Sequence, residues 1–249
     1  MGSKLYRQYY DGVLEQMNLV MDNELDRIEQ GAAWIAQAVK ADLRVHVYGT
    51  GGHNFMAACE IWTRAGSLCN YNLWMPPGTP CFMSNPSTEN VPGLAARVFD
   101  YYRPRPGEPL ILININGINA TTIDSALEAR RRGIRAIGVS SRRFAENVEP
   151  DCPQRHPSGR NLCDLVDLHI DAYTPVGDMI LTIEKAGRKT ASSSTFPLTL
   201  ILHLLNARAI EMLVDEGIVP DFLMSGNTKA GAAWSRTMRD KWIDRIKHM

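Results

Sequence analysis

The chain carries no excess charge of either sign, no paired cysteines and no long apolar run. Lys and Arg together number 27, as do Asp and Glu, so no overall field would attract nucleic acid or an anionic membrane. The five cysteines form no Cys-x-x-Cys pair, and their odd number argues against a disulfide framework.

Targeting and membrane signals are missing too. The amino terminus lacks the apolar core of a signal peptide. The most apolar window, Phe196 to Leu205, has about half the length that a membrane span needs. These absences predict a cytoplasmic protein that contacts neither nucleic acid nor membrane.

Metal and dinucleotide motifs are also absent. The six histidines are scattered, with no His-x-x-x-His and no carboxylate pair at ligand spacing. The glycine-rich turn after the first expected strand is no dinucleotide fingerprint, because the third glycine of that motif would fall at Asn54. The sequence therefore implies no metal and no cofactor.

The periodicity of apolar residues predicts an α/β domain that follows a helical start. Helical spacing runs from Leu5 to Val39, with a break at Asp22-Asn23. Strands and helices then alternate, which predicts a five-stranded parallel sheet with helices on both faces. The expected strands are 43–48, 70–75, 109–113, 134–139 and 166–170, and the expected helices are 54–65, 92–102, 120–132 and 196–216. Residues 76–88 and 140–163 are expected loops. We predict an N-terminal helical extension over 1–40 and the α/β domain over 41–249.

In such a sheet the ligand site lies beyond the carboxyl ends of the strands. The turn after the first strand, Gly49-Thr50-Gly51-Gly52-His53, can bring backbone N–H groups close to an anion or a sugar. A tight turn also needs glycine for packing alone. On the helix that follows, Glu60 precedes Arg64 by one turn. This spacing suits either a solvated ion pair or, among apolar neighbours, a general base.

The turns after later strands are polar. The turn after 109–113 holds Asn114, Asn116, Gly117 and Asn119, whose amides could bind sugar hydroxyls or cap the next helix. The loop 140–163 carries His156, Ser158 and Arg160, which can bind an anion. Four hydroxyl residues precede the last long helix: Ser192, Ser193, Ser194 and Thr195. One of them would suffice as a cap, whereas four form a donor-rich cup for a phosphate or a polyol.

The order of these motifs resembles the SIS (sugar isomerase) domain family, and more closely a bacterial subfamily of phosphosugar-binding SIS proteins, over nearly the whole chain. The segments that carry the resemblance are Gly49-Thr50-Gly51 with His53, Glu60 with Arg64-Ala65-Gly66, Asn116-Gly117 with Asn119-Ala120, Arg155-His156 with Ser158-Gly159, Pro175-Val176-Gly177-Asp178, Ser194-Thr195, Asn206, and Ser225 with Asn227 and Gly231. The resemblance implies a flavodoxin-like (Rossmann-like) fold and a homodimer or homotetramer that binds a sugar or a sugar phosphate.

The resemblance also implies aldose–ketose isomerisation through an enediol, with Glu60 as the base. His156 and His53 are the candidates for opening the ring or shuttling a proton. The residues that would bind the sugar are Thr50, Gly51, Gly52, Asn54, Asn114, Asn116, Gly117, Asn119, Ser158, Arg160, Ser192, Ser193, Ser194 and Thr195. Two other functions compete: a non-catalytic sugar-binding protein, and a lyase acting on an ether-substituted aminosugar.

The sequence departs from the family at the phosphate-binding positions. Asn114 and Asn116 stand where SIS domains usually have serine, and His53 and Asn54 replace serine in the first turn. An amide presents a carbonyl that repels phosphate. The departure favours a sugar whose phosphate is held differently or is absent.

Overall fold

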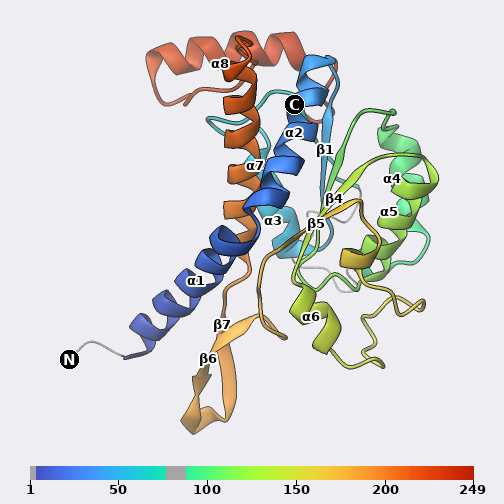
Figure 1. The fold of residues 1–249 in the computed structure, drawn as a ribbon, viewed down its shortest axis with the longest axis vertical. Helices are drawn as coiled ribbons and strands as arrows, with labels where there is room; N and C mark the ends of the chain where they lie inside the picture. The colour runs from blue at the N-terminus through green and yellow to red at the C-terminus, as the bar shows by residue number, and fades with distance from the viewer. Residues whose placement is uncertain (1–3, 77–87) are drawn as a thin grey trace.

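The computed structural model describes residues 4–76 and 88–249. Most of the expected loop 76–88 therefore lies outside the described residues. The described part contains one five-stranded sheet, a two-stranded hairpin and helices on both faces of the sheet (Figure 1).

The central sheet is parallel throughout, with the strand order β2-β1-β3-β4-β5. Its strands are β1 Val45–Gly49, β2 Tyr71–Leu73, β3 Leu110–Ile113, β4 Ala136–Ser140 and β5 Leu168–Asp171. Every residue of β1 to β4 is buried, as expected for a sheet covered on both faces. The predicted five-stranded parallel sheet is confirmed. The strand order reverses between β1 and β3, which places the topological switch point at their carboxyl ends.

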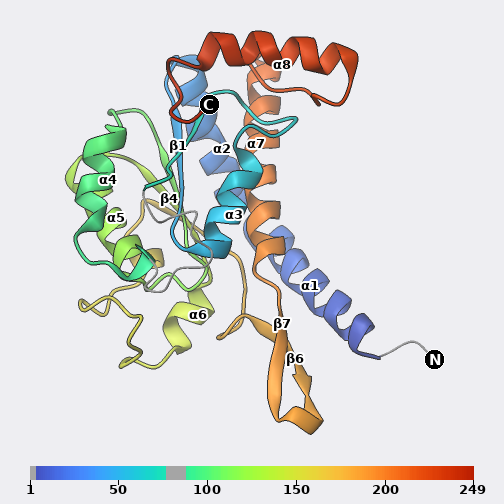
Figure 2. The ribbon, with the colours of Figure 1, turned by 180° about the vertical axis from the view of Figure 1, so that it is seen from behind.

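Two helical layers cover the sheet (Figures 1 and 2). One core cluster joins the sheet to α2 Leu25–Lys40, α3 Gly52–Ile61 and α7 Thr195–Asp215. The other joins it to α4 Leu94–Tyr102 and α5 Ala120–Arg131. These helices lie where the apolar spacing predicts them, within a few residues at each end.

The long helix α7 corrects one expectation. Its 21 residues make it, among the described residues, a helix long and apolar enough to cross a membrane, so the expectation of an insufficient length was wrong. The helix packs against α2 and α3, and Leu198, Ile201 and Leu205 are fully buried in the main core. Its apolar composition therefore serves the packing of this layer.

The N-terminal helices separate at Glu24, next to the predicted break. Helix α1 spans Lys4–Asn23, and Glu24 is 1% exposed. Its carboxylate accepts a hydrogen bond from Tyr173 Oη at 2.8 Å and pairs with Arg27 at 3.0 Å. Helix α2 belongs to the main core, whereas the start of α1 extends away from the body (Figure 1). The domain boundary at residue 40 stays a prediction.

Several elements were not predicted from the sequence: α6 Arg142–Asn147, the antiparallel hairpin of β6 Met179–Ile183 and β7 Arg188–Ser192, α8 Lys229–Trp242, and short 3₁₀ turns at Thr88–Asn90, Leu162–Asp164 and Glu184–Ala186. The expectation that 140–163 is loop throughout was wrong at α6. This helix has only six residues, and Ser141 caps it by accepting a hydrogen bond from Phe144 N. The hairpin is largely exposed, so it carries no alternation of buried and exposed residues from which it could be predicted.

Candidate functional site

The turn after β1 packs against the protein's own atoms. A Cβ on Gly49 would lie 2.2 Å from the backbone oxygen of Asn54, so this glycine permits close contact between β1 and α3. Gly51 has φ +85°, and a Cβ there would lie 1.8 Å from Glu89 Oε2. The Glu89 carboxylate thus covers the glycine that an anion would approach. The glycines at 49 and 51 serve internal packing here.

At the switch point, hydrogen bonds join the asparagine turn after β3 to the turn after β1. Asn114 is fully buried, and its Nδ2 donates to Thr50 Oγ1 at 2.9 Å and to Asn119 Oδ1 at 3.1 Å. Its Oδ1 accepts a hydrogen bond from Gly117 N at 2.8 Å. The buried Asn54 joins the same network through Thr50 O at 2.7 Å. These amides use their hydrogen-bonding groups to hold the two turns together.

Asn116 differs from its neighbours, because it is partly exposed. Its Oδ1 accepts from Ile118 N at 3.2 Å, and its amide N–H₂ makes no hydrogen bond with a described residue. Of the three asparagines in this turn, Asn116 is the one with a donor left for a ligand.

The hydroxyl residues before α7 enclose a carboxylate. Asp178 Oδ1 accepts hydrogen bonds from the backbone N–H groups of Ser193 at 2.9 Å and Ser194 at 2.8 Å. Asp178 Oδ2 accepts from Ser194 Oγ at 2.8 Å. Both serines are 1% exposed. Two of the four hydroxyl residues that the sequence assigns to a phosphate or a polyol, Ser193 and Ser194, thus bind an internal acid.

A buried glutamine on α1 completes this corner. Gln16 Nε2 donates to Ser193 Oγ at 2.9 Å, and Gln16 Oε1 accepts from Thr174 Oγ1 at 3.3 Å. Helix α1 is thereby joined to the segment after β5 and to the start of α7. Ser192 ends β7 and is exposed, while Thr195 begins α7 and is partly exposed.

His53 lies at the start of α3, beside the same corner. Its Nε2 atom is buried and has no hydrogen-bond partner among the described residues. Burial lowers the pKa of His53, and the nearby Asp178 carboxylate opposes that change. The imidazole is therefore neutral at pH 7 and has an unused polar atom near the carboxyl edge of the sheet.

His156 lies in the other helical layer. Its Nε2 is 3.2 Å from Asp124 Oδ1 on α5, and its Nδ1 is 2.7 Å from Ser158 Oγ. Its backbone N–H donates to Ile118 O at 2.7 Å. Ser158 and Arg160 are exposed on the same loop. These contacts place His156 with α5, and not with α3, which carries His53 and Glu60.

Glu60 faces α7 across the seam where α3 and α7 pack side by side (Figure 2). Its carboxylate is 3.0 Å from the Arg64 guanidinium and 3.7 Å from His203 Nε2 on α7. The side chains of Glu60 and His203 are 34% and 47% exposed. A carboxylate and an imidazole thus lie near each other at a partly accessible surface, and both groups are of the kinds that act as general acids and bases.

Comparison with known proteins decides the family. The SIS domain model matches residues 8–141. A UPF0309 protein of Streptomyces griseus is 34% identical over 98% of this chain and 97% of its own length. The chain belongs to the SIS domain family. A UPF0309 protein of Caldanaerobacter subterraneus is 29% identical over 97% of the chain and 98% of its own length.

Solved structures share the SIS fold at low sequence identity. The phosphoheptose isomerase GmhA from Neisseria gonorrhoeae has a TM-score of 0.56 at 12% identity, covering 83% of this chain and 97% of that one. The sugar isomerase domain of an RpiR transcription factor from Sphaerobacter thermophilus has a TM-score of 0.52 at 14% identity, covering 98% and 100%. The first title describes an isomerase and the second a regulator, so this likeness establishes the fold alone.

The SIS domain therefore distributes the expected site residues over two regions. Thr50, Asn114 and Asn119 hold turns together, and Ser193 and Ser194 bind Asp178. His53 and Glu60 lie on α3 in one layer. His156, Ser158 and Arg160 lie beside α5 in the other.

His203 was not proposed from the sequence. The available signal was a polar stripe in an apolar helix: Thr195, Thr199 and His203 recur every four residues, on one face of α7.

Proposed function

We propose that this SIS domain is a sugar isomerase that interconverts an aldose and a ketose at the seam between α3 and α7. The contact between Glu60 and His203, 3.7 Å apart with both side chains partly exposed, carries the proposal. The packing of α3 on α7 brings together two groups that are 143 positions apart in the chain.

The chemistry needs one base and one proton carrier. In the proposed reaction the Glu60 carboxylate removes the proton from the carbon beside the carbonyl. It returns that proton to the former carbonyl carbon. Between these steps His203 moves a proton between the two oxygens of the enediolate. Arg64, 3.0 Å from Glu60, holds the carboxylate in place. No atom is lost or gained, and no cofactor enters the scheme.

His53 has a place in the same scheme. It precedes Glu60 by seven residues on α3, which is two turns and roughly 10 Å along the helix axis. A sugar lying along the seam could therefore contact both side chains. The neutral imidazole suits ring opening, provided that the bound sugar displaces the side chains that bury its unpartnered Nε2. A role for His156 at this seam would require a second subunit, because within one chain it lies beside α5.

We further propose that the sugar does not place a phosphate at the start of α7. Asp178 already occupies the N–H groups there, and a second anion would be repelled by it. Isothermal titration with a ketose and with its phosphate ester tests this proposal. We expect the ketose to bind at least as tightly as the ester, and binding of the ester alone would contradict it.

Solvent-deuterium exchange into candidate sugars, followed by NMR, tests the class of activity. We expect deuterium to appear at the carbon beside the carbonyl, because the base exchanges its proton with water during the enediol step. Loss of a ring substituent would indicate the lyase. Binding without exchange would indicate a non-catalytic sugar-binding protein, a function for which the RpiR likeness is a precedent in fold only.

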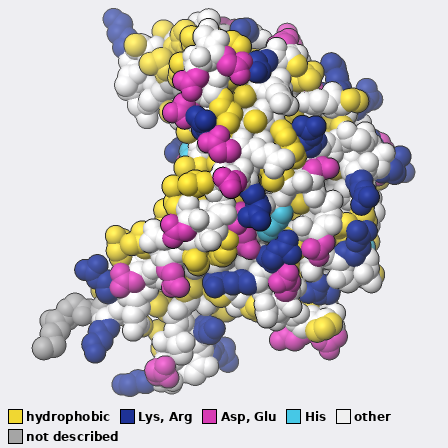
Figure 3. Space-filling view, viewed as in Figure 1, with side chains coloured by type: hydrophobic (Ala, Val, Ile, Leu, Met, Phe, Trp, Pro, Cys, Tyr) yellow, Lys and Arg dark blue, Asp and Glu magenta, His cyan; other side chains and the backbone are white. Residues whose placement is uncertain are grey.

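A second copy of the chain completes the proposal. The face that contains α7 is hollowed between α8 and the projecting α1 (Figure 3). Large apolar side chains of α1 are exposed at helical spacing: Tyr6, Tyr10, Leu14 and Met21. A homodimer would bury this stripe and exclude water from the seam. A cytoplasmic location is part of the same proposal.

A further inference from the structure

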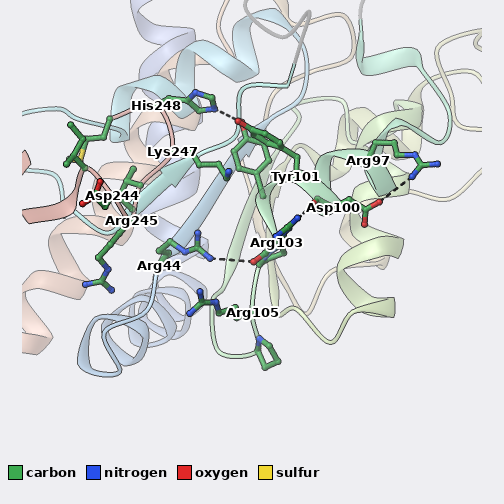
Figure 4. Close-up of a pocket in the computed structure, with 16 residues that line it drawn as sticks. Arg44, Arg97, Asp100, Tyr101, Arg103, Arg105, Asp244, Arg245, Lys247 and His248 are labelled. Carbon is green, nitrogen blue, oxygen red and sulfur yellow. Dashed lines mark hydrogen bonds and ion pairs between the residues drawn. The ribbon is translucent and has the colours of Figure 1, made fainter.

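A large groove lies at the amino edge of the sheet, beside the end of α4 (Figure 4). It has a volume of about 1090 Å³. Its walls are Arg44, which precedes β1, the segment 103–106, which precedes β3, and the carboxyl-terminal residues 243–249. Segments that precede parallel strands lie at the amino edge. None of the lining residues of the groove belongs to α3 or α7, the two helices that form the seam. The groove is therefore a separate site.

The groove concentrates positive charge in a chain that has no net charge. Six of its lining residues are Lys or Arg and two are Asp. Three of the six are already paired: Arg44 with Glu108, Arg97 with Asp100 and Arg245 with Asp42.

The other three cations have no carboxylate partner among the described residues. Arg103 donates at 3.3 Å to the backbone oxygen of Asp100. Lys247 Nζ lies 4.1 Å from the centre of the Tyr101 ring. The Arg105 side chain makes no hydrogen bond or ion pair with a residue that the structure describes. Charged donors left in this state are suited to bind phosphate oxygens.

The backbone holds two of these arginines in fixed positions. The sequence Arg103-Pro104-Arg105-Pro106 alternates arginine with proline, which fixes φ at every second residue. Arg103 ends α4 with φ +49°, a left-handed conformation that is uncommon outside glycine. Arg105 N donates to the buried Glu108 Oε2 at 2.8 Å. Such preorganisation reduces the ordering cost of binding a ligand.

An apolar pocket adjoins the basic groove. It has a volume of about 520 Å³ and is lined by Met75, Leu94 and Val98. Four residues line both cavities: Arg97, Tyr101, Tyr102 and His248. The Tyr102 hydroxyl is hydrogen-bonded to His248 Nε2 at 3.0 Å, whereas Tyr101 as a residue is 54% exposed. Lys247 lies over one face of the Tyr101 ring, so a ligand would stack on the part of the ring that Lys247 leaves open.

The geometry points to a nucleoside polyphosphate as the ligand of this double cavity, with its phosphates on Arg103, Arg105 and Lys247 and its base against Tyr101 in the apolar pocket. Three unpaired cations outnumber Asp244, the lining acid that forms no ion pair among the described residues, so the groove keeps an excess of positive charge for a polyphosphate. A planar base is the apolar part that stacks on an aromatic ring. The binding site requires no contact with the proposed sugar site.

Isothermal titration of the full chain with ATP and GTP tests the assignment. Adenosine alone probes the apolar pocket, and inorganic triphosphate alone probes the basic groove. We expect at least one of the two nucleotides to bind at least about tenfold more tightly than adenosine or inorganic triphosphate. Inorganic triphosphate binding as tightly as both nucleotides would overturn the proposal, as would tighter binding of a single-stranded oligonucleotide. Absence of binding by both nucleotides would overturn it as well.

Matched variants locate the site. Arg105→Glu and Lys247→Glu should each weaken nucleotide binding at least about tenfold, and Tyr101→Ala should weaken nucleotide binding more than binding of inorganic triphosphate. Arg236→Glu makes the same change of charge on the exposed surface of α8 and should leave binding unchanged. An equal loss of nucleotide affinity in Arg236→Glu and Arg105→Glu would show that binding depends only on the total charge, and it would overturn the assignment of this site.

Discussion

At the scale of single residues, two carboxylates stand where the sequence predicts a ligand. Asp178 accepts the N–H groups at the start of α7, and Glu89 covers Gly51 in the turn after β1. A serine run or a glycine turn shows that donors are present, and it does not show what they bind. In this chain the acids that occupy them come from 15 to 38 residues away, so no local pattern reveals them.

Replacing Asp178 by Asn should destabilise the protein. The carboxylate makes charge-assisted hydrogen bonds at the positive end of α7, and losing such a cap costs about 1 kcal/mol of unfolding free energy. Urea denaturation measures this loss. Asp240→Asn on the exposed face of α8 is the matched control and should change little. An Asp178→Asn variant as stable as the control would show that the acid contributes nothing to this corner.

The residues of the proposed site could be predicted unequally well. Glu60 is visible from the sequence because Ala57, Ala58 and Ile61 leave it as an acid on an apolar helix. Its partner His203 is not visible, because only the packing of α3 on α7 brings the two together. The same limit applies to His156, whose loop could not be placed without the structure.

At the scale of elements, the spacing of apolar residues predicts the helices and strands of the core, but it does not predict the exposed elements at the periphery. Strands β1 to β4 are short apolar segments buried on both faces, and α7 packs on α2 and α3, so the apolar residues of these elements record their burial. The hairpin β6–β7 is largely exposed, and α8 buries few of its residues. Neither leaves a strong apolar pattern in the sequence.

The turn from β1 to α3 depends on glycine at position 49. A Cβ there would lie 2.2 Å from Asn54 O and 2.7 Å from Phe55 N, both backbone atoms that cannot move independently. We expect Gly49→Ala to lower the free energy of unfolding by more than about 2 kcal/mol. Gly226→Ala, where no heavy atom lies within 4 Å of the added Cβ, should be nearly neutral. Similar thermal denaturation midpoints for the two variants would contradict this account of the turn.

At the scale of the whole molecule, buried histidines link stability to pH. His169 lies 2.9 Å from Ser140 Oγ, and burial lowers its pKa to about 3, with Arg142 and Arg27 acting in the same direction. Burial also lowers the pKa of His46. The folded protein therefore takes up these protons at a lower pH than the unfolded chain, which does so below about pH 6.5.

Stability should therefore be complete above about pH 6.5 and should fall as the pH decreases toward 3. His169 contributes a slope of up to about 1.4 kcal/mol per pH unit within that window. Chemical denaturation at a series of pH values from about 7.5 to about 4.5 measures how the unfolding free energy of wild type and of His169→Gln depends on pH. The variant should show the shallower dependence, and parallel profiles would show that His169 is charged in the folded state.

The exposed stripe on α1 predicts self-association. Leu14→Glu should weaken the proposed dimer, because it places a charge in the apolar contact. Gln8→Glu, an exposed position on the opposite side of α1, is the control. Sedimentation velocity should show a dimer for wild type and for the control and a shift toward monomer for Leu14→Glu. A monomeric wild-type protein would contradict the proposed homodimer.

The central claim is that Glu60 is the base of a sugar isomerase at the seam between α3 and α7. It is tested most directly by the rate of solvent-deuterium incorporation into a responsive sugar, measured by NMR for wild type, Glu60→Gln and Glu146→Gln. Glu146 forms the matched i,i+4 pair with Arg142 at 3.1 Å on the surface. We predict at least about a 10²-fold slower exchange for Glu60→Gln with sugar affinity nearly unchanged, and wild-type exchange for Glu146→Gln. Exchange by Glu60→Gln at the wild-type rate would contradict the claim.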